Sequence, residues 1–298
     1  MAINGTLHKY NARHVAFEHA TKDSPDAQEH LLLYIGGLTD GLLTTPYTTL
    51  LAQSLPKHWT LAQPLLASSY EGFGCASLQT DAQEVAECVS YFRTKQKKKT
   101  IALLGCSTGC QDIMTYLLKA DSPAVQGGML QASASDREAM GMFVTAEQMK
   151  IAVDAAQALV DRGMPEEIVP KEHLPKFMTT PMTARRFLSL ASPNHDSEDD
   201  MFSSDLSDEQ LARTFGALPA STPLCIFYSG NDQFVPATVD KEKLVQRWVD
   251  ASRRGNSAVD EEFSGVILGA THTLEGSPEK TMTDFFGRVT GFLRKIEQ

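Results

Sequence analysis

The chain has 298 residues, of which 42% are hydrophobic and 21% are charged, as in folded globular proteins and unlike disordered ones. Its 27 basic and 37 acidic residues give a formal charge of -10, which argues against a nucleic-acid partner and against an anionic membrane. No apolar run approaches the roughly 20 residues of a membrane span, and the first 21 residues lack the apolar core of a secretory signal. We therefore expect a cytoplasmic protein.

The five cysteines are odd in number and have no spacing typical of a zinc site or a disulfide framework. No group of histidines and acidic residues has the spacing of a metal site either. We expect reduced thiols, no metal and no cofactor. Cys106 and Cys110 are expected to pack in the interior rather than to control redox state.

Short apolar runs alternate with segments of helical spacing along most of the chain. Strands are expected at residues 31–35, 60–66, 100–104, 125–132, 223–228 and 263–268, and helices at 81–94, 110–120 and 282–296. Continuous apolar strands separated by helices indicate an α/β fold, in which helices cover both faces of a mostly parallel sheet.

Residues 137–215 interrupt this alternation. The segment is helical in parts, contains several prolines, and is too long for a simple crossover between two strands. We predict a single domain over residues 1–298, with 137–215 inserted between core strands as a helical cap or lid.

A glycine-flanked serine follows the strand at 100–104. The motif reads Gly105-Cys-Ser107-Thr-Gly109, and a helix is expected directly after it. Strand, tight turn and helix in this order are typical of a nucleophile elbow, where the helix N-terminus favours developing negative charge. Ser107 is therefore the predicted nucleophile. A glycine-rich turn with a capping serine is the structural alternative.

A base and an orienting carboxylate are expected at neighbouring strand ends. His272 lies between the last strand and the last helix, and Asp232 follows the strand at 223–228. The order Ser, Asp, His is that of the α/β-hydrolases. Asp136, after the strand at 125–132, is the rival for the carboxylate, and His195 in the predicted cap is more typical of a solvated histidine.

Two backbone N–H groups are needed to bind an oxyanion. Thr108, the residue after the nucleophile, is expected to supply one. Leu38, in the glycine-rich loop after the strand at 31–35, is expected to supply the other, with Gly37 as the alternative. Residues 68–74, including Tyr70, either line the substrate pocket or form a surface loop.

Several of these motifs occur together in one known family. They are residues 33–41 (LYIGGLTDG), 68–74, 105–109, 130–131 with 135–138, and 228–232 (YSGND). Over most of its length the sequence resembles the α/β-hydrolase family that contains the fungal esterases of fusarinine-type siderophores.

The resemblance implies a serine esterase with Ser107, Asp232 and His272 as its triad. Such an enzyme would cleave the ester bonds of a hydroxamate siderophore through an acyl-enzyme and so ease the release of iron. Because fusarinine units carry free amino groups, acidic cap residues such as Asp196 are expected to favour the substrate, unless they form only a solvated loop.

Two other functions stay open at this stage. One is a carboxylesterase or thioesterase that acts on a different acyl substrate. The other is an interaction protein that retains the fold without catalysis, because a fold alone does not imply activity. An intact Ser107, Asp232 and His272 argues against the second.

Overall fold

The computed structural model describes residues 2–21 and 28–297. In this part of the chain eight strands form one sheet, in the order β1-β2-β4-β3-β5-β6-β7-β8. β2 pairs antiparallel with both β1 and β4, whereas the other neighbours are parallel. The strands are β1 (Gly5–Lys9), β2 (Val15–His19), β3 (His30–Ile35), β4 (Trp59–Pro64), β5 (Thr100–Cys106), β6 (Gly127–Gln131), β7 (Leu224–Ser229) and β8 (Gly265–Ile267).

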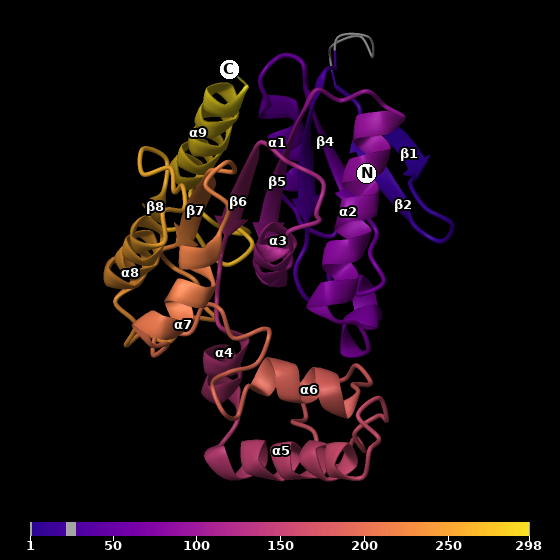
Figure 1. The fold of residues 1–298 in the computed structure, drawn as a ribbon, viewed down its shortest axis with the longest axis vertical. Helices are drawn as coiled ribbons and strands as arrows, with labels where there is room; N and C mark the ends of the chain where they lie inside the picture. The colour runs from indigo at the N-terminus through magenta and orange to yellow at the C-terminus, as the bar shows by residue number, and fades with distance from the viewer. Residues whose placement is uncertain (1, 22–27, 298) are drawn as a thin grey trace.

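Helices cover both faces of this sheet (Figure 1). Those of the core are α1 (Thr48–Ser54), α2 (Leu78–Thr94), α3 (Thr108–Leu118), α8 (Lys241–Arg254) and α9 (Glu279–Ile296). Because strand side chains alternate between faces, Leu31 and Leu33 join the cluster beneath α2, α3 and α8, while Leu32 and Tyr34 join the cluster beneath α1 and α9. The predicted α/β-hydrolase fold class is confirmed.

The remaining helices lie between β6 and β7. They are α4 (Asp136–Phe143), α5 (Ala146–Asp161), α6 (Ala184–Ala191) and α7 (Asp208–Arg213), followed by a 3-10 turn at Phe215–Ala217. α5 and α6 lie beyond one end of the sheet (Figure 1). They share a hydrophobic cluster of their own, which includes Ala152, Ala156, Phe187 and Leu190.

The end of the inserted segment packs differently from its beginning. Phe202, Leu211 and Phe215 belong to the main core cluster, and the ring of Phe215 stacks on Trp248 of α8 at 5.0 Å. We therefore propose that the cap is the part of 137–215 that precedes about residue 192, and that the rest completes one face of the sheet.

No helix in the described ranges is long and apolar enough to cross a membrane.

Candidate active site

Ser107 occupies the sharp turn between β5 and α3. Its backbone has φ 55° and ψ -124°, a conformation that side-chain-bearing residues rarely adopt and that costs about 1–3 kcal/mol. A Cβ on Gly105 would lie 2.3 Å from the carbonyl oxygen of Gly109, and a Cβ on Gly109 would lie 2.2 Å from that of Ile35. Both glycines are therefore required for the helix to start this close to the sheet.

Asp232 and His272 meet at the ends of β7 and β8. The Nδ1 atom of His272 lies 2.8 Å from Oδ2 of Asp232, and both residues are buried. The other carboxylate oxygen accepts the N–H of Phe234 at 2.9 Å. The Phe234 ring packs edge-on against the imidazole, with 4.8 Å between centroids. A proton held on Nδ1 leaves Nε2 as the proton acceptor of His272.

Gln131, the last residue of β6, connects the serine turn to the histidine loop. Its backbone carbonyl accepts the N–H of Ser107 at 3.0 Å. Its side-chain Nε2 donates to the carbonyl of His272 at 2.8 Å and to Oγ of Ser229 at 3.1 Å. Its side-chain Oε1 accepts a hydrogen bond from the Tyr47 hydroxyl at 3.2 Å. The sequence reasoning assigned no role to Gln131, although a glutamine that ends a buried strand is itself an indication of a polar network.

The loop after β3 approaches Ser107 closely. A Cβ on Gly37 would lie 2.7 Å from Cβ of Ser107, so the approach requires glycine. The N–H of Gly37 donates to Oδ2 of Asp40 at 2.9 Å and is therefore occupied. Within residues 2–21 and 28–297, the N–H groups of Leu38 and Thr108 have no hydrogen-bond partner, which leaves both free to bind an oxyanion.

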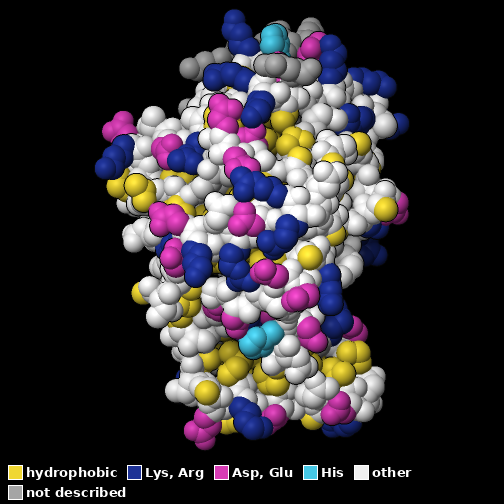
Figure 2. All heavy atoms as spheres, turned by 60° about the vertical axis from the view of Figure 1, so that its left-hand side comes forward, with side chains coloured by type: hydrophobic (Ala, Val, Ile, Leu, Met, Phe, Trp, Pro, Cys, Tyr) yellow, Lys and Arg dark blue, Asp and Glu magenta, His cyan; other side chains and the backbone are white. Residues whose placement is uncertain are grey.

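These residues open into a cavity of about 440 Å³, a size typical of small-molecule sites. Ser107 and His272 both line it. Most of the remaining wall is apolar, and the cap supplies much of it, with Phe143 and Phe177 partly exposed to solvent. Hydrophobic side chains also gather on the surface of the cap end, at the bottom of Figure 2.

One further carboxyl, Asp136, lines the same cavity. Burial raises its pKa to about 7, and the nearby Asp199 adds to the rise, while Arg186, Gln111 and His272 oppose it. Asp136 accepts a hydrogen bond from Nε2 of Gln111 at 2.7 Å. His272 pairs with Asp232 and not with Asp136, so Asp136 lines the cavity without orienting the imidazole.

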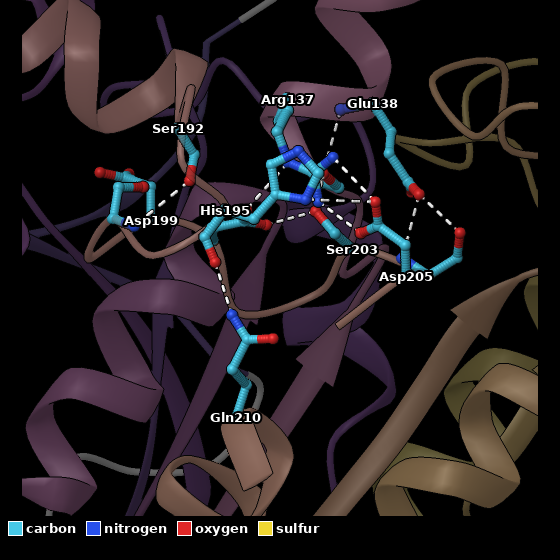
Figure 3. A network of polar contacts seen from close by, with 12 residues as sticks. Arg137, Glu138, Ser192, His195, Asp199, Ser203, Asp205 and Gln210 are labelled. Atoms are coloured by element: carbon cyan, nitrogen blue, oxygen red, sulfur yellow. Dashed lines mark hydrogen bonds and ion pairs between the residues drawn. The ribbon is translucent and has the colours of Figure 1, made fainter. Parts of the chain in front are cut away.

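The acidic residues expected in the cap do not line this cavity. Asp196 lines a separate surface hollow, and Asp200 is paired with Arg137 at 2.9 Å. Figure 3 shows Arg137 beside Asp205, whose carboxylate is also 3.4 Å from Nδ1 of His195. Asp200 and Asp205 are therefore committed to ion pairs between α4 and the loop that joins α6 to α7, and Asp196 lies at a different hollow from the one that holds Ser107.

Tyr70 also lies outside the cavity. Its ring covers Gly41, and its hydroxyl accepts the N–H of Leu42 at 3.2 Å. Tyr70 therefore supports the loop that contains Leu38 from the outside and does not contact the space above Ser107.

Cys106 and Cys110, on either side of Ser107, are buried. The thiol of Cys110 donates to the carbonyls of Gly105 and Gln131, and burial raises its pKa to about 12. A thiol with a raised pKa reacts slowly, so this geometry favours packing over redox control.

Comparison with known proteins shows similarity over nearly the whole chain. A family model described as "Protein of unknown function (DUF1749)" matches residues 1–294. The chain is 36% identical to the fusarinine C esterase sidJ of Aspergillus fumigatus, over 99% of this chain and 96% of that protein. It is 35% identical to the esterase AN6793 of Emericella nidulans, over 98% and 93%.

Solved structures show the same similarity. The siderophore hydrolase EstB of Aspergillus fumigatus matches with a TM-score of 0.83 and 34% identity, over 99% of this chain and 98% of that one. A carboxyl esterase of Bacillus coagulans, 11% identical, shares the fold with a TM-score of 0.62. The two named esterases and the siderophore hydrolase EstB together show a carboxylic ester hydrolase. The chain belongs to the DUF1749 family, within the α/β-hydrolase fold.

Proposed function

We propose that Ser107, His272 and Asp232 form a catalytic triad that hydrolyses the ester bonds of a hydroxamate siderophore of the fusarinine type. The observation that carries the proposal is the convergence on one cavity of a serine in a nucleophile elbow and a histidine paired with a buried carboxylate. The names of the relatives in Aspergillus fumigatus support the substrate class.

The reaction follows from these positions. Oγ of Ser107 attacks the ester carbonyl while Nε2 of His272 takes its proton, and Asp232 stabilises the imidazolium. The N–H groups of Leu38 and Thr108 bind the oxyanion. The intermediate collapses, and the alcohol leaves with the proton from His272. Water, activated by the same histidine, then releases the carboxylic acid and restores the serine.

The proposed cellular role is the release of iron in the cytoplasm. A hydroxamate siderophore holds one ferric ion through several linked arms, and the link raises the effective concentration of each arm. Cleavage of the ester links removes this advantage. The cavity of about 440 Å³ lies in the lower part of the small-ligand range, so we expect it to admit one ester-linked arm at a time.

The apolar wall of the cavity favours one alternative, an esterase or thioesterase for another apolar acyl group. The cap supplies this wall from side chains such as Met140, Phe143 and Met182, none of which can bind a polar group strongly. A non-catalytic interaction protein would not need the strained serine or the free N–H groups beside it.

The experiment incubates the protein with a ferric fusarinine-type siderophore and follows the products by liquid chromatography and mass spectrometry. Ser107→Ala is the test variant. Ser54→Ala is the matched control, because Ser54 ends α1 and its hydroxyl donates to the carbonyl of Leu51 in the same helix. Linear and monomeric units that appear with wild type and control, but not with Ser107→Ala, support the proposal. Fluorophosphonate labelling of Ser107 without siderophore cleavage would retain the hydrolase and reject the substrate.

A further inference from the structure

The catalytic cavity carries negative charge that the triad chemistry does not use. Two carboxylates outside the triad, Asp40 and Asp136, line it, whereas no lysine or arginine of the described ranges does. Asp40 has a structural role, because one of its oxygens accepts the N–H of Gly37 and the other accepts the Thr44 hydroxyl at 2.8 Å. Asp136 is therefore the carboxylate that remains for a ligand.

The local structure does not otherwise require an acid at position 136. Ser135 already caps α4, because its hydroxyl accepts the N–H of Glu138 at 3.1 Å. One oxygen of Asp136 accepts the amide of Gln111 at 2.7 Å, and no ion pair or second hydrogen bond to the carboxylate exists in residues 2–21 and 28–297. Gln111 is fully buried and fixes the carboxylate from behind the cavity wall.

The charged groups around Asp136 do not neutralise it. Arg186, on α6, is committed to Asp199 at 2.6 Å and to the carbonyl of Phe73. Asp199 is itself negative and raises the cost of a second anion nearby. His272 lines the same cavity and is paired with Asp232 at 2.8 Å. An acidic side chain in this setting is stabilised most by a cation that enters the cavity.

We propose that Asp136 is the binding site for an ammonium group on the ester substrate, and so selects cationic esters over neutral and anionic ones. The proposal rests on the proposed function, since the ammonium must enter the cavity that holds Ser107. The apolar wall of the cavity cannot bind an ammonium group, whereas the carboxylate of Asp136 can. An anionic substrate would be disfavoured at the same position by like-charge repulsion.

The test compares pairs of esters that differ only in charge. Each pair carries either a trimethylammonium group or its neutral tert-butyl isostere, separated from the ester carbonyl by one to four methylenes. The readout is the ratio of kcat/KM for the charged ester to that for the neutral ester. A change in the protonation of the triad alters kcat/KM for both esters by the same factor, so it cancels in this ratio.

In the wild type the ratio at pH 8 should reach about tenfold at one spacer length, as expected for one partly shielded ion pair. It should fall towards one as the pH drops below about 7, because protonation removes the charge of Asp136. The trimethylammonium group does not titrate, so a change of the ratio with pH must come from a group on the protein.

Asp136→Asn should bring the ratio close to one and make it independent of pH. Glu138→Gln is the matched control: it removes one negative charge from the same helix, at a side chain that binds Ser204 and does not line the cavity. The control should keep the ratio of the wild type. A wild-type ratio of one or less at every spacer length, or a ratio that survives Asp136→Asn, would overturn the proposal.

Binding separates this proposal from the proposed function. Amide analogues of the same pairs can be titrated into Ser107→Ala by calorimetry, which needs no turnover. A Kd ratio that favours the ammonium analogue and depends on Asp136 would support the site even if no ester were cleaved. Equal Kd values would reject it even if the esterase activity were established. If Asp136→Asn does not fold, the pH dependence of the wild-type kcat/KM ratio decides, because protonation of the triad cancels in it.

Discussion

Gln131 offers a sharp test of how the serine turn and the histidine loop are held together. Replacing it by methionine keeps its length and removes its amide. Three buried hydrogen bonds disappear, to His272, Ser229 and Tyr47. At about 0.5–1.5 kcal/mol each, the loss of these three bonds lowers the free energy of unfolding by about 1.5–4.5 kcal/mol. The backbone bond from Ser107 to residue 131 is retained, so the elbow itself should survive.

The larger effect is expected on catalysis. Without the amide, the carbonyl of His272 loses its hydrogen bond. The residue is then held by its N–H bond to Gln233 and by the contacts of its ring with Asp232 and Phe234. A displacement of about 1 Å in a catalytic group can cost on the order of 100-fold in rate. We therefore expect kcat for a neutral ester to fall by about 10- to 100-fold, with a smaller change in KM.

The assay measures kcat per active site, counted by titration with a fluorophosphonate, and the free energy of unfolding by urea. Gln246→Met is the control, because Gln246 is exposed on α8 and its amide donates to Asp250 one turn along the same helix. A kcat within twofold of the wild type, together with a stability loss of several kcal/mol, would show that Gln131 is structural and does not position His272. No change in either quantity would refute the bridging role altogether.

Two further substitutions test the site directly. Asp232→Asn should lower kcat on the order of 10⁴-fold, by analogy with serine proteases, because the imidazole loses its orienting charge; a loss of tenfold or less would transfer the role to Asp136. Gly37→Ala should lower kcat by at least tenfold with little change in KM, because the new Cβ would lie 2.7 Å from Cβ of Ser107 and displace the loop of Leu38. Unchanged turnover in this variant would remove that loop from the oxyanion site.

The strands that carry the site could be predicted because each is buried on both faces. β3, β5 and β7 are continuous apolar runs, and every residue in them is buried. β8 is shorter than the predicted run at 263–268 and only partly buried. β1 was not predicted, because it is an exposed edge strand with one buried residue in five and has little apolar pattern. β2 was not predicted either, because its apolar run is only three residues long before Glu18 and His19.

The connections within the site could not be predicted from local pattern. The side chain of Gln131 contacts residues 84 and 141 positions away, and Gln111 meets Asp136 across 25 residues. The occupied N–H of Gly37, which favours Leu38 as the donor, depends on a turn that only the structure describes. The predicted placement of Tyr70 and Asp196 relied on sequence proximity to loops, which says nothing of which side of a loop faces the cavity.

The two halves of the site come from different parts of the fold, and this separation has a consequence for specificity. Ser107 and His272 are fixed by strand ends of the sheet, where packing and buried hydrogen bonds leave little freedom. Much of the cavity wall, including Phe143, comes from the cap, which has its own hydrophobic cluster, and Asp136 stands at the start of α4 directly before it. Substitutions in that segment can change which ester is bound without moving the reacting atoms. Differences in substrate between members of this family should therefore map to α4 and the cap helices.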